Sequence, residues 1–246
     1  MKTALYGRIV FGAAAVLLGA IALMWHDSDT WQTLSEIWRL PFGAIIGGCL
    51  MTAQIAGGVG MQYPRTARWA SIVLGVVYLL FSLACIPAII AEPAVFYHYG
   101  SFCEQFSALG GALALCSATE THEARAAALG RVARLGLGVS AIAFSLDQII
   151  YLRVTADLVP RWIPPNPMFW AMLTTVAFAL AAIAILIHRQ ARLALRLMTL
   201  MLGLFGVLVW IPRLIAHPEA HLNWSEFGLN LLITGAAWMV AEVKSL

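Results

Sequence analysis

The chain has 246 residues, of which 61% are apolar and 11% charged, with a net charge of +3 and a mean hydropathy of +0.84. A soluble domain carries about a quarter charged residues and could not bury so large an apolar share. The composition therefore excludes a soluble or disordered protein, and the absence of a basic tail argues against nucleic-acid binding. Because the apolar runs are continuous and lipid requires internal backbone hydrogen bonds, we expect an all-α polytopic membrane protein.

Eight apolar runs along the chain are candidates for transmembrane helices. The apolar share corresponds to roughly 150 residues, or seven or eight crossings of about 20 residues each. The predicted spans in chain order are Ile9–Trp25, Leu40–Gly60, Trp69–Ile90, Phe102–Ala118, Leu135–Leu152, Met168–Ile187, Leu193–Ile211 and Ser225–Ala241. Pro212 is expected to end the seventh span.

The basic residues are distributed unevenly between the two sides that these spans define. Eleven fall at the termini and in the second-to-third, fourth-to-fifth and sixth-to-seventh loops: Lys2, Arg8, Arg65, Arg68, Arg125, Arg131, Arg134, Arg189, Arg192, Arg196 and Lys244. Four fall on the other side: Arg39, Arg153, Arg161 and Arg213. Because cytoplasmic loops are enriched in Lys and Arg, we predict that both termini lie in the cytoplasm and that the protein resides in the inner (cell) membrane.

The two halves of the sequence resemble each other. Gly7-Arg8 before the first span recurs as Gly130-Arg131 before the fifth, and the segment 86–93 recurs as 211–218 in the pattern I-P-x-x-I-A-x-P. Each half would contain four spans, so both would enter the membrane in the same sense. We therefore predict a parallel duplication, with a first four-helix unit over 1–120 and a second over 121–246.

Segments of the second half resemble the DoxX-like membrane proteins, which are built from four-helix units that are sometimes duplicated in one chain. The segment 158–164, followed by Phe169-Trp170, is similar to the family's connection between its first two helices. Ile211-Pro212, followed by Trp224, is similar to its third-to-fourth helix turn. The resemblance extends over 7–241 and is weaker in the first half.

The resemblance implies a function more loosely than it implies a fold. Some DoxX-like proteins are linked to thiosulfate and quinone oxidation or to redox-stress complexes, so a quinone cofactor and membrane or redox protein partners are implied for this chain. Many relatives carry Gln-His near the outer end of the helix that matches the fifth span. This chain has Asp147-Gln148 at those positions, so a role of that histidine would not carry over.

Ionisable residues inside or at the ends of spans are the best indicators of a site, because a charge in hydrocarbon costs roughly 2.5–3.5 kcal/mol or more. Asp147, Glu104, Glu226 and Arg213 are expected at one depth near the outer membrane face, with Arg39 near them. One interpretation is an outward-opening polar pocket in which the carboxylates pair with Arg213 or Arg39. The other is that each group simply reaches the headgroup layer or caps a helix.

Asp147 is the strongest of these candidates and should point into protein, with Arg213 or Arg39 as its partner. Gln148 follows it and completes the candidate binding cluster Asp147, Gln148, Arg213, Glu104, Glu226 and Arg39. Because adjacent residues point about 100° apart on a helix, Asp147 and Gln148 should not both lie at the centre of one narrow pocket.

Histidines and cysteines do not form a recognisable metal or redox motif. His217 and His221 have helical ligand spacing, but Pro218 indicates a loop, so no metal site is predicted. There is no C-x-x-C motif, and the four cysteines are interpreted as packing residues. A disulfide between Cys85 and Cys103 is the alternative, because both lie near the outer ends of adjacent spans.

Small residues recur at four-residue spacing in the second span, beginning with Gly43-x-x-x-Gly47. This spacing favours close helix packing within the bundle, with a homodimer face as the alternative. The sequence as a whole leaves three functional hypotheses: a subunit or enzyme of a quinone-linked redox system, a small-molecule or lipid-binding carrier, and a structural subunit of a larger membrane complex. Whether the protein is an enzyme is left open.

Overall fold

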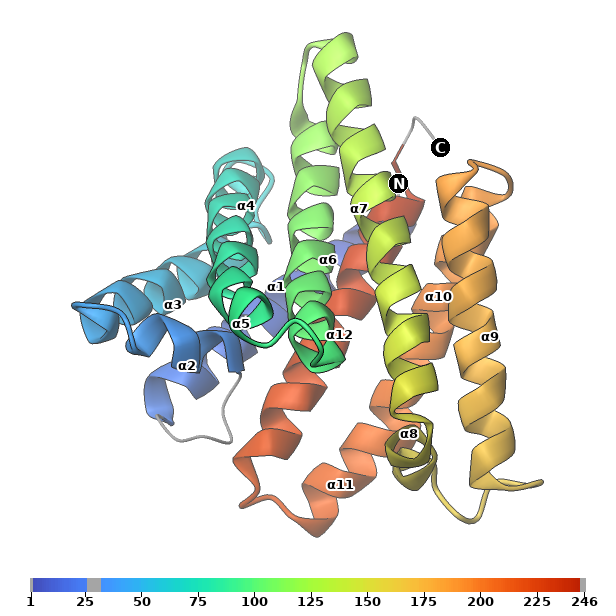
Figure 1. Ribbon diagram of the computed structural model, residues 1–246. Coiled ribbons are helices and arrows are strands. Elements are labelled where there is room, and N and C mark those ends of the chain that lie inside the picture. Colours follow the sequence, from blue (N-terminus) through green and yellow to red (C-terminus); the bar gives the residue numbers. More distant parts are fainter. Residues whose placement is uncertain (1, 26–31, 244–246) are drawn as a thin grey trace.

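The structure is a computed structural model that describes residues 2–25 and 32–243. Within that part of the chain all regular structure is helical, as expected from the composition. The elements are α1 (Lys2–Met24), α2 (Gln32–Trp38), α3 (Gly43–Gly60), α4 (Ala67–Ala84), α5 (Ile86–Ala91), α6 (Phe96–Thr119), α7 (Glu123–Ile150), α8 (Leu152–Leu158), α9 (Pro167–Leu186), α10 (Ala191–Phe205), the π-helical segment η1 (Gly206–Trp210), α11 (Ile211–Ala216) and α12 (His221–Ala241) (Figure 1).

Six helical segments of the described chain are long and apolar enough to cross a membrane. They are Leu5–Met24, Gly43–Gly60, Ala67–Ala91, Glu123–Ile150, Pro167–Leu186 and Ala191–Ala216. Large apolar side chains such as Trp69, Leu180 and Leu200 are more than half exposed on these helices, which is the surface expected where lipid replaces water. The chain is therefore a multi-pass helical membrane protein whose exterior contacts lipid.

Helices α6 and α12 are the two long helices that do not meet this criterion of apolarity. Both lie in the interior of the molecule: α6 packs on α4, α7 and α12, while α12 packs on α1, α10 and α6. Polar side chains of a helix that faces protein on most sides need not be exposed to hydrocarbon. The predicted fourth and eighth spans correspond to these helices.

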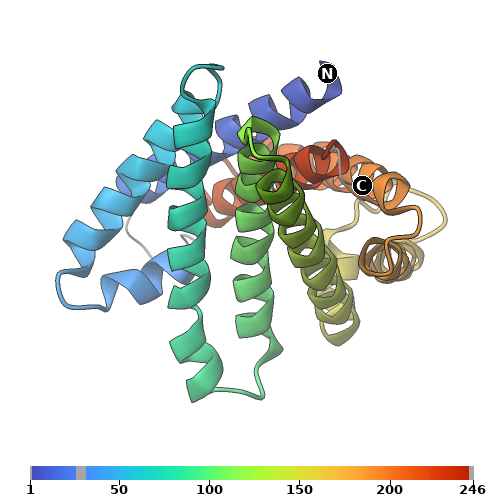
Figure 2. The same ribbon diagram turned by 90° about the horizontal axis from the view of Figure 1, so that it is seen from above.

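The long helices pack in a closed order around the molecule. Each contacts the next in the sequence α1, α3, α4, α6, α7, α9, α10, α12 and back to α1, and α6 also contacts α12 across the middle. Figure 1 shows α3 and α4 on one side, α9 and α10 on the other, and α6, α7 and α12 between them; the view from above in Figure 2 preserves this separation. The two sides are thus separate regions joined through α6 and α12.

Glycines set the close approach of several helix pairs. A Cβ on Gly235 of α12 would lie 2.6 Å from the backbone nitrogen of Phe11 on α1. A Cβ on Gly47 of α3 would lie 2.6 Å from Nε1 of Trp38, which closes α2 onto α3. The Gly43-x-x-x-Gly47 stripe therefore serves packing within the chain, as predicted.

The helix boundaries differ from the predicted spans where polar residues continue a helix beyond the apolar run. Helix α7 begins at Glu123, about three turns before the predicted start at Leu135. Pro212 does not end the seventh span: the chain passes through η1 and continues as α11 to Ala216. A proline has no N–H to donate, and the π-helical segment directly before Pro212 already interrupts the regular hydrogen-bond pattern of the helix.

The recurring I-P-x-x-I-A-x-P segments have the same local backbone in both halves. In each, a short helix carries its proline in the first turn and ends at a residue with φ near −135° and ψ of 68°, namely Glu92 after α5 and His217 after α11. The next long helix begins four residues later in both cases, at Phe96 and at His221. This likeness concerns only these two short segments.

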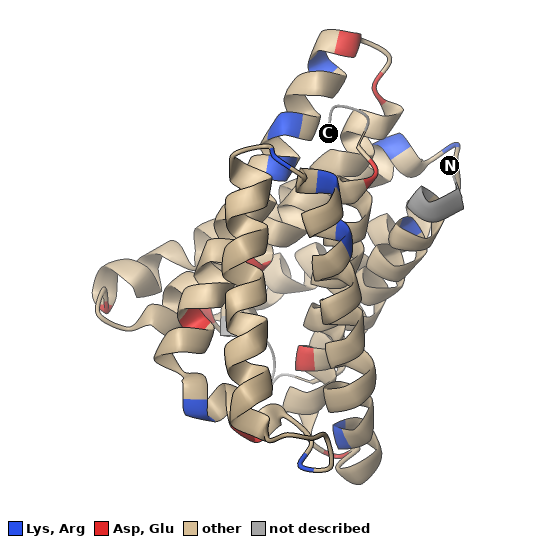
Figure 3. Ribbon diagram, turned by 90° about the vertical axis from the view of Figure 1, so that its right-hand side faces the viewer, with Lys and Arg blue, Asp and Glu red and all other residues tan. Residues whose placement is uncertain are grey.

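The basic residues gather at one end of the molecule. Figure 3 shows most Lys and Arg segments at the end of the molecule where α1 begins and α12 ends, with few at the other end. The uneven distribution predicted from the loops is therefore present in three dimensions, apart from Lys244, which lies outside the described residues.

Candidate functional site

The two predicted cationic partners of Asp147 are engaged elsewhere. Arg39 donates a hydrogen bond of 2.7 Å to Glu36, one turn earlier, and is exposed. Arg213 donates to the backbone oxygen of Asp157 at 3.4 Å and lies 5.9 Å from the ring centre of Trp210. The predicted pairing of Asp147 with Arg213 or Arg39 is therefore wrong. Depth along a span fixes only height in the membrane; Arg39 directly follows α2 and Arg213 lies on α11, and these positions bring them to other acceptors.

Three of the predicted carboxyl groups do come together, each from a different helix. Glu104 of α6 interacts electrostatically with Glu226 of α12 and Asp147 of α7, and Glu226 also interacts with Asp147. Asp147 packs against Gly100, where a Cβ would lie 3.4 Å from its Oδ1 atom. That oxygen is buried and has no hydrogen-bond partner among the described residues. The junction of α6, α7 and α12 thus holds three acidic side chains.

Gln148 is held by the neighbouring helix α9. Its Oε1 atom accepts hydrogen bonds from the hydroxyls of Thr174 at 3.3 Å and Thr175 at 3.0 Å. Although Asp147 and Gln148 point in different directions, both line one cavity, because that cavity is wider than the narrow pocket considered from the sequence. Gln148 and Thr174 therefore form an ordered polar group beside Asp147.

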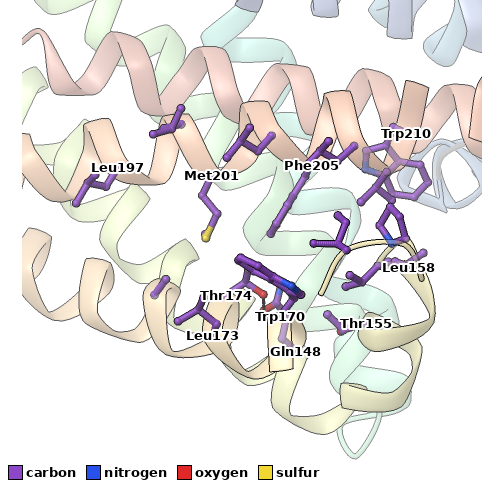
Figure 4. Close-up of a pocket in the computed structure, with 18 of the residues that line it drawn as sticks. Gln148, Thr155, Leu158, Trp170, Leu173, Thr174, Leu197, Met201, Phe205 and Trp210 are labelled. Atoms are coloured by element: carbon purple, nitrogen blue, oxygen red, sulfur yellow. Dashed lines mark hydrogen bonds between the residues drawn. The ribbon is translucent and has the colours of Figure 1, made fainter. Parts of the chain in front are cut away.

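The cavity occupies about 430 Å³ between α7, α8, α9, α10 and η1. In Figure 4, Met201 and Phe205 of α10 point toward Trp170 of α9 across this space. The lining residues are Asp147, Gln148, Thr155, Leu158, Val159, Pro160, Ile163, Trp170, Leu173, Thr174, Ala177, Leu197, Leu200, Met201, Leu204, Phe205, Leu208, Val209 and Trp210. The walls are mainly apolar, and the polar side chains come from α7, α8 and α9.

The local structure of α9 and η1 shapes two walls of the cavity. Helix α9 starts sharply, because Oδ1 of Asn166 accepts the N–H of Phe169 at 2.9 Å and Pro167 occupies its first turn. At the opposite wall the π-helical η1 interrupts the regular helix, and Leu208, Val209 and Trp210 from it face the cavity. Single π-helical turns occur frequently at functional sites.

The cavity opens sideways between α9 and α10. Leu173, Leu200 and Leu204 line it and are nevertheless 45%, 60% and 47% exposed. In a membrane these exposed leucine surfaces face lipid. A molecule dissolved in the bilayer could therefore reach the cavity without crossing an aqueous phase.

The remaining candidates from the sequence do not join this site. His217 contacts Glu219 at 3.4 Å, whereas the ring of His221 stacks on Trp25 at 3.9 Å. Within the described ranges, no group of three or more His, Cys, Asp or Glu side chains could hold a metal ion. Cys85 and Cys103 are buried as free thiols, so the alternative of a disulfide between them is not what this structure contains.

Sequence reasoning identified Asp147 and Gln148 but missed most of the cavity wall. The available signal was the pair Thr174-Thr175 inside an otherwise apolar span, since hydroxyls there must find partners on a neighbouring helix. The apolar lining residues carry no such signal, because they are indistinguishable in sequence from residues that face lipid or the core.

Comparison with known proteins identified no relative of this chain. No protein-family model matches the chain, no curated protein matches its sequence, and no solved structure matches it.

Proposed function

We propose that this membrane protein binds a small amphipathic molecule with an apolar body in the cavity between α9 and α10. The observation that carries the proposal is the cavity itself. Its volume of about 430 Å³ falls within the range of roughly 300–1,000 Å³ typical of ligand pockets. An apolar wall with a few polar groups at one end is also the usual composition of such sites.

The resemblance to DoxX-like proteins favours a quinone-linked redox role for this binding site. A quinone combines an apolar tail with a polar ring, which suits a cavity that is mostly apolar but bordered by Gln148, Thr155 and Thr174. A lipid or small-molecule carrier would use the same cavity and is the alternative. A purely structural subunit of a larger complex would have no need of the cavity.

The same proposal includes an architecture of eight spans in two tandem four-helix units, 1–120 and 121–246. The interior placement of α6 and α12 supports their counting as spans despite their polarity. The matching backbone around α5 and α11 supports the duplication. The basic end seen in Figure 3 supports cytoplasmic termini in the inner membrane.

Cysteine accessibility tests this orientation. Thr121 and Glu219 are exposed and lie in loops at opposite ends of the long helices. A membrane-impermeant thiol reagent added to intact cells should label a Glu219→Cys variant and spare a Thr121→Cys variant. The reverse labelling would place both termini outside.

Tryptophan fluorescence tests the binding function, because Trp170 and Trp210 line the cavity. A long-chain alcohol with a nitroxide on its chain should quench this fluorescence saturably in the purified protein. Ala177→Phe, which fills the cavity, should abolish the saturable component. Leu180→Phe is the matched control, since Leu180 lies one turn later on α9 and faces outward at 61% exposure.

Competition by a short-chain ubiquinone analogue separates the redox role from the carrier role. Displacement of the nitroxide probe supports a quinone-linked function. Probe binding without displacement supports a carrier of other amphiphiles. Equal quenching in the wild type, Ala177→Phe and Leu180→Phe would overturn binding at this cavity altogether.

A further inference from the structure

The inner wall of the cavity carries a single kind of charge. Asp147 lines it, and none of the described residues that line it is Lys, Arg or His. Asp147 stands between the cavity on one side and Gly100 of α6 on the other. A polar head group that reaches this wall therefore lies beside a carboxyl group.

Two further carboxyl groups lie behind this wall. Glu104 and Glu226 interact electrostatically with Asp147 and with each other. Tyr97 of α6 also lies within electrostatic range of all three. No described Lys, Arg or His forms an ion pair with these acids: the described pairs are Arg39–Glu36, Arg68–Glu120, Arg196–Glu242, His98–Glu92 and His217–Glu219. The cluster consequently lacks a compensating positive charge from the described chain.

This arrangement discriminates between possible head groups. An anionic head would place a negative charge beside three acidic side chains whose own ionised forms already disfavour one another in a medium of low dielectric. A cationic head would relieve that repulsion, and a neutral donor would hydrogen-bond the part of the Asp147 carboxyl group that borders the cavity; its Oδ1 atom is buried beside Gly100 and is out of reach. The discrimination comes from charge and not from the shape of the cavity.

We infer that the cavity selects amphiphiles whose head donates hydrogen bonds and carries no negative charge, a protonated amine most strongly and a hydroxyl next. The inference rests on the proposed binding function and specifies its ligand class: of a quinone and its reduced quinol, the quinol, whose hydroxyls donate, is the form that fits. The head lies at Asp147, and the chain lies along Leu197, Leu200 and Leu204 of α10. From Leu197 to Phe205 this wall extends about 12 Å, at 1.5 Å per residue.

Arg213 is a competing feature and must be separated experimentally. It lies over Trp210, which lines the cavity, but its guanidinium donates to the backbone of Asp157 and it is not among the lining residues. If an anionic head were recognised, Arg213 would be the group expected to bind it. A variant of Arg213 therefore belongs in the test.

The experiment compares three nitroxide-labelled C18 chains that differ only in the head: a primary amine, an alcohol and a carboxylate. Each is titrated into purified protein at pH 7 while the quenching of tryptophan fluorescence is measured. We expect the amine to bind about tenfold more tightly than the carboxylate, a difference of about 1.4 kcal/mol, with the alcohol between them. Asp147→Asn should bring the amine to the affinity of the alcohol, whereas Asp157→Asn, an exposed site on α8, should leave the order unchanged.

The outcomes distinguish failure of the inference from failure of the function. If all three chains bind saturably with equal affinity and Ala177→Phe removes all binding, the cavity binds amphiphiles but the selection by charge is wrong. Tighter binding of the carboxylate that is lost in Arg213→Gln would also overturn the inference. If Ala177→Phe changes nothing for any head, the binding function itself fails.

Discussion

The region between α3 and α4 and the region between α9 and α10 occupy comparable places on opposite sides of α6 and α12, yet only the second is hollow. On the first side, α2 packs on both α3 and α4, with Leu34 and Ile37 buried. A cavity of only about 10 Å³ lies on this side, between α2, α5 and α6, where Thr33, Ala88 and His98 line it. On the second side, α8 packs on α9 and α7, and about 430 Å³ remains open beside α10.

Side-chain size at the start of the outer helix explains part of this difference. Gly43 and Gly47 let α2 lie directly on α3, since a Cβ at either position would overlap α2. If the halves are aligned as in the proposed duplication, with Phe42 on Phe169, the positions on α9 that match Gly43 and Gly47 are Trp170 and Thr174. Larger side chains there hold the connecting segment away, and the indole of Trp170 instead donates to the Pro164 oxygen at 2.9 Å. On the first side α2 thus fills the space against α3, whereas on the second side a cavity remains.

Truncating Trp38, which packs α2 against α3, should have the largest effect on stability. Trp38 packs against the core and against Gly47, so Trp38→Ala should lower the free energy of unfolding by about 3 kcal/mol. The measurement is thermal unfolding in detergent. Trp162→Ala is the control, because Trp162 is 72% exposed and its loss should be nearly neutral. Equal losses in the two variants would show that α2 does not close the first side.

Adding one methyl group on α3 at its contact with α2 should have a somewhat smaller effect on stability. A Cβ on Gly43 would lie 2.5 Å from the Ile37 carbonyl oxygen and 2.6 Å from that of Trp38. Backbone atoms cannot move aside cheaply, so Gly43→Ala should destabilise by about 2 kcal/mol. Gly48→Ala, on the same helix, meets nothing within 4 Å and should be neutral or slightly stabilising. The comparison would break if Gly48→Ala were the more damaging change.

Neutralising the cavity carboxylate should stabilise the protein modestly. Asp147 has a buried oxygen without a hydrogen-bond partner and two acidic neighbours. Asp147→Asn should therefore raise the free energy of unfolding by about 1 kcal/mol, the opposite of the loss expected if an arginine were paired with it. The melting temperature of Asp157→Asn, at an exposed site, should stay within error of the wild type. A clear fall for Asp147→Asn would reveal a stabilising partner.

Partly filling the cavity beside α10 should have the smallest effect on stability. Ala177 lines the cavity, and Ala177→Val should change stability by no more than about 0.5 kcal/mol, because open space accepts the added methyls without strain. Measured by the same melting assay, a loss above 2 kcal/mol would mean that the second side is as tightly packed as the first.

The sequence alone determined the class of protein and the elements of its site, but not their partners. A composition with 61% apolar residues requires lipid as solvent, and lipid permits continuous apolar runs only as helices. The grouping of Asp147, Glu104 and Glu226 near one end of the bundle also followed, because depth along a span can be counted in residues. The depth of a residue in the membrane depends on its distance along its own span, so it can be predicted from the sequence.

Tertiary structure alone decided which helices face protein, which arginine meets which acceptor and where space is left. Arg39 and Arg213 bind Glu36 and the Asp157 carbonyl instead of Asp147. The polar residues of α6 are tolerated because neighbouring helices shield them from lipid. A prediction that considers each span by itself does not include this shielding. The cavity arises because α8 packs away from α10, and a volume left between helices depends on all of their positions at once.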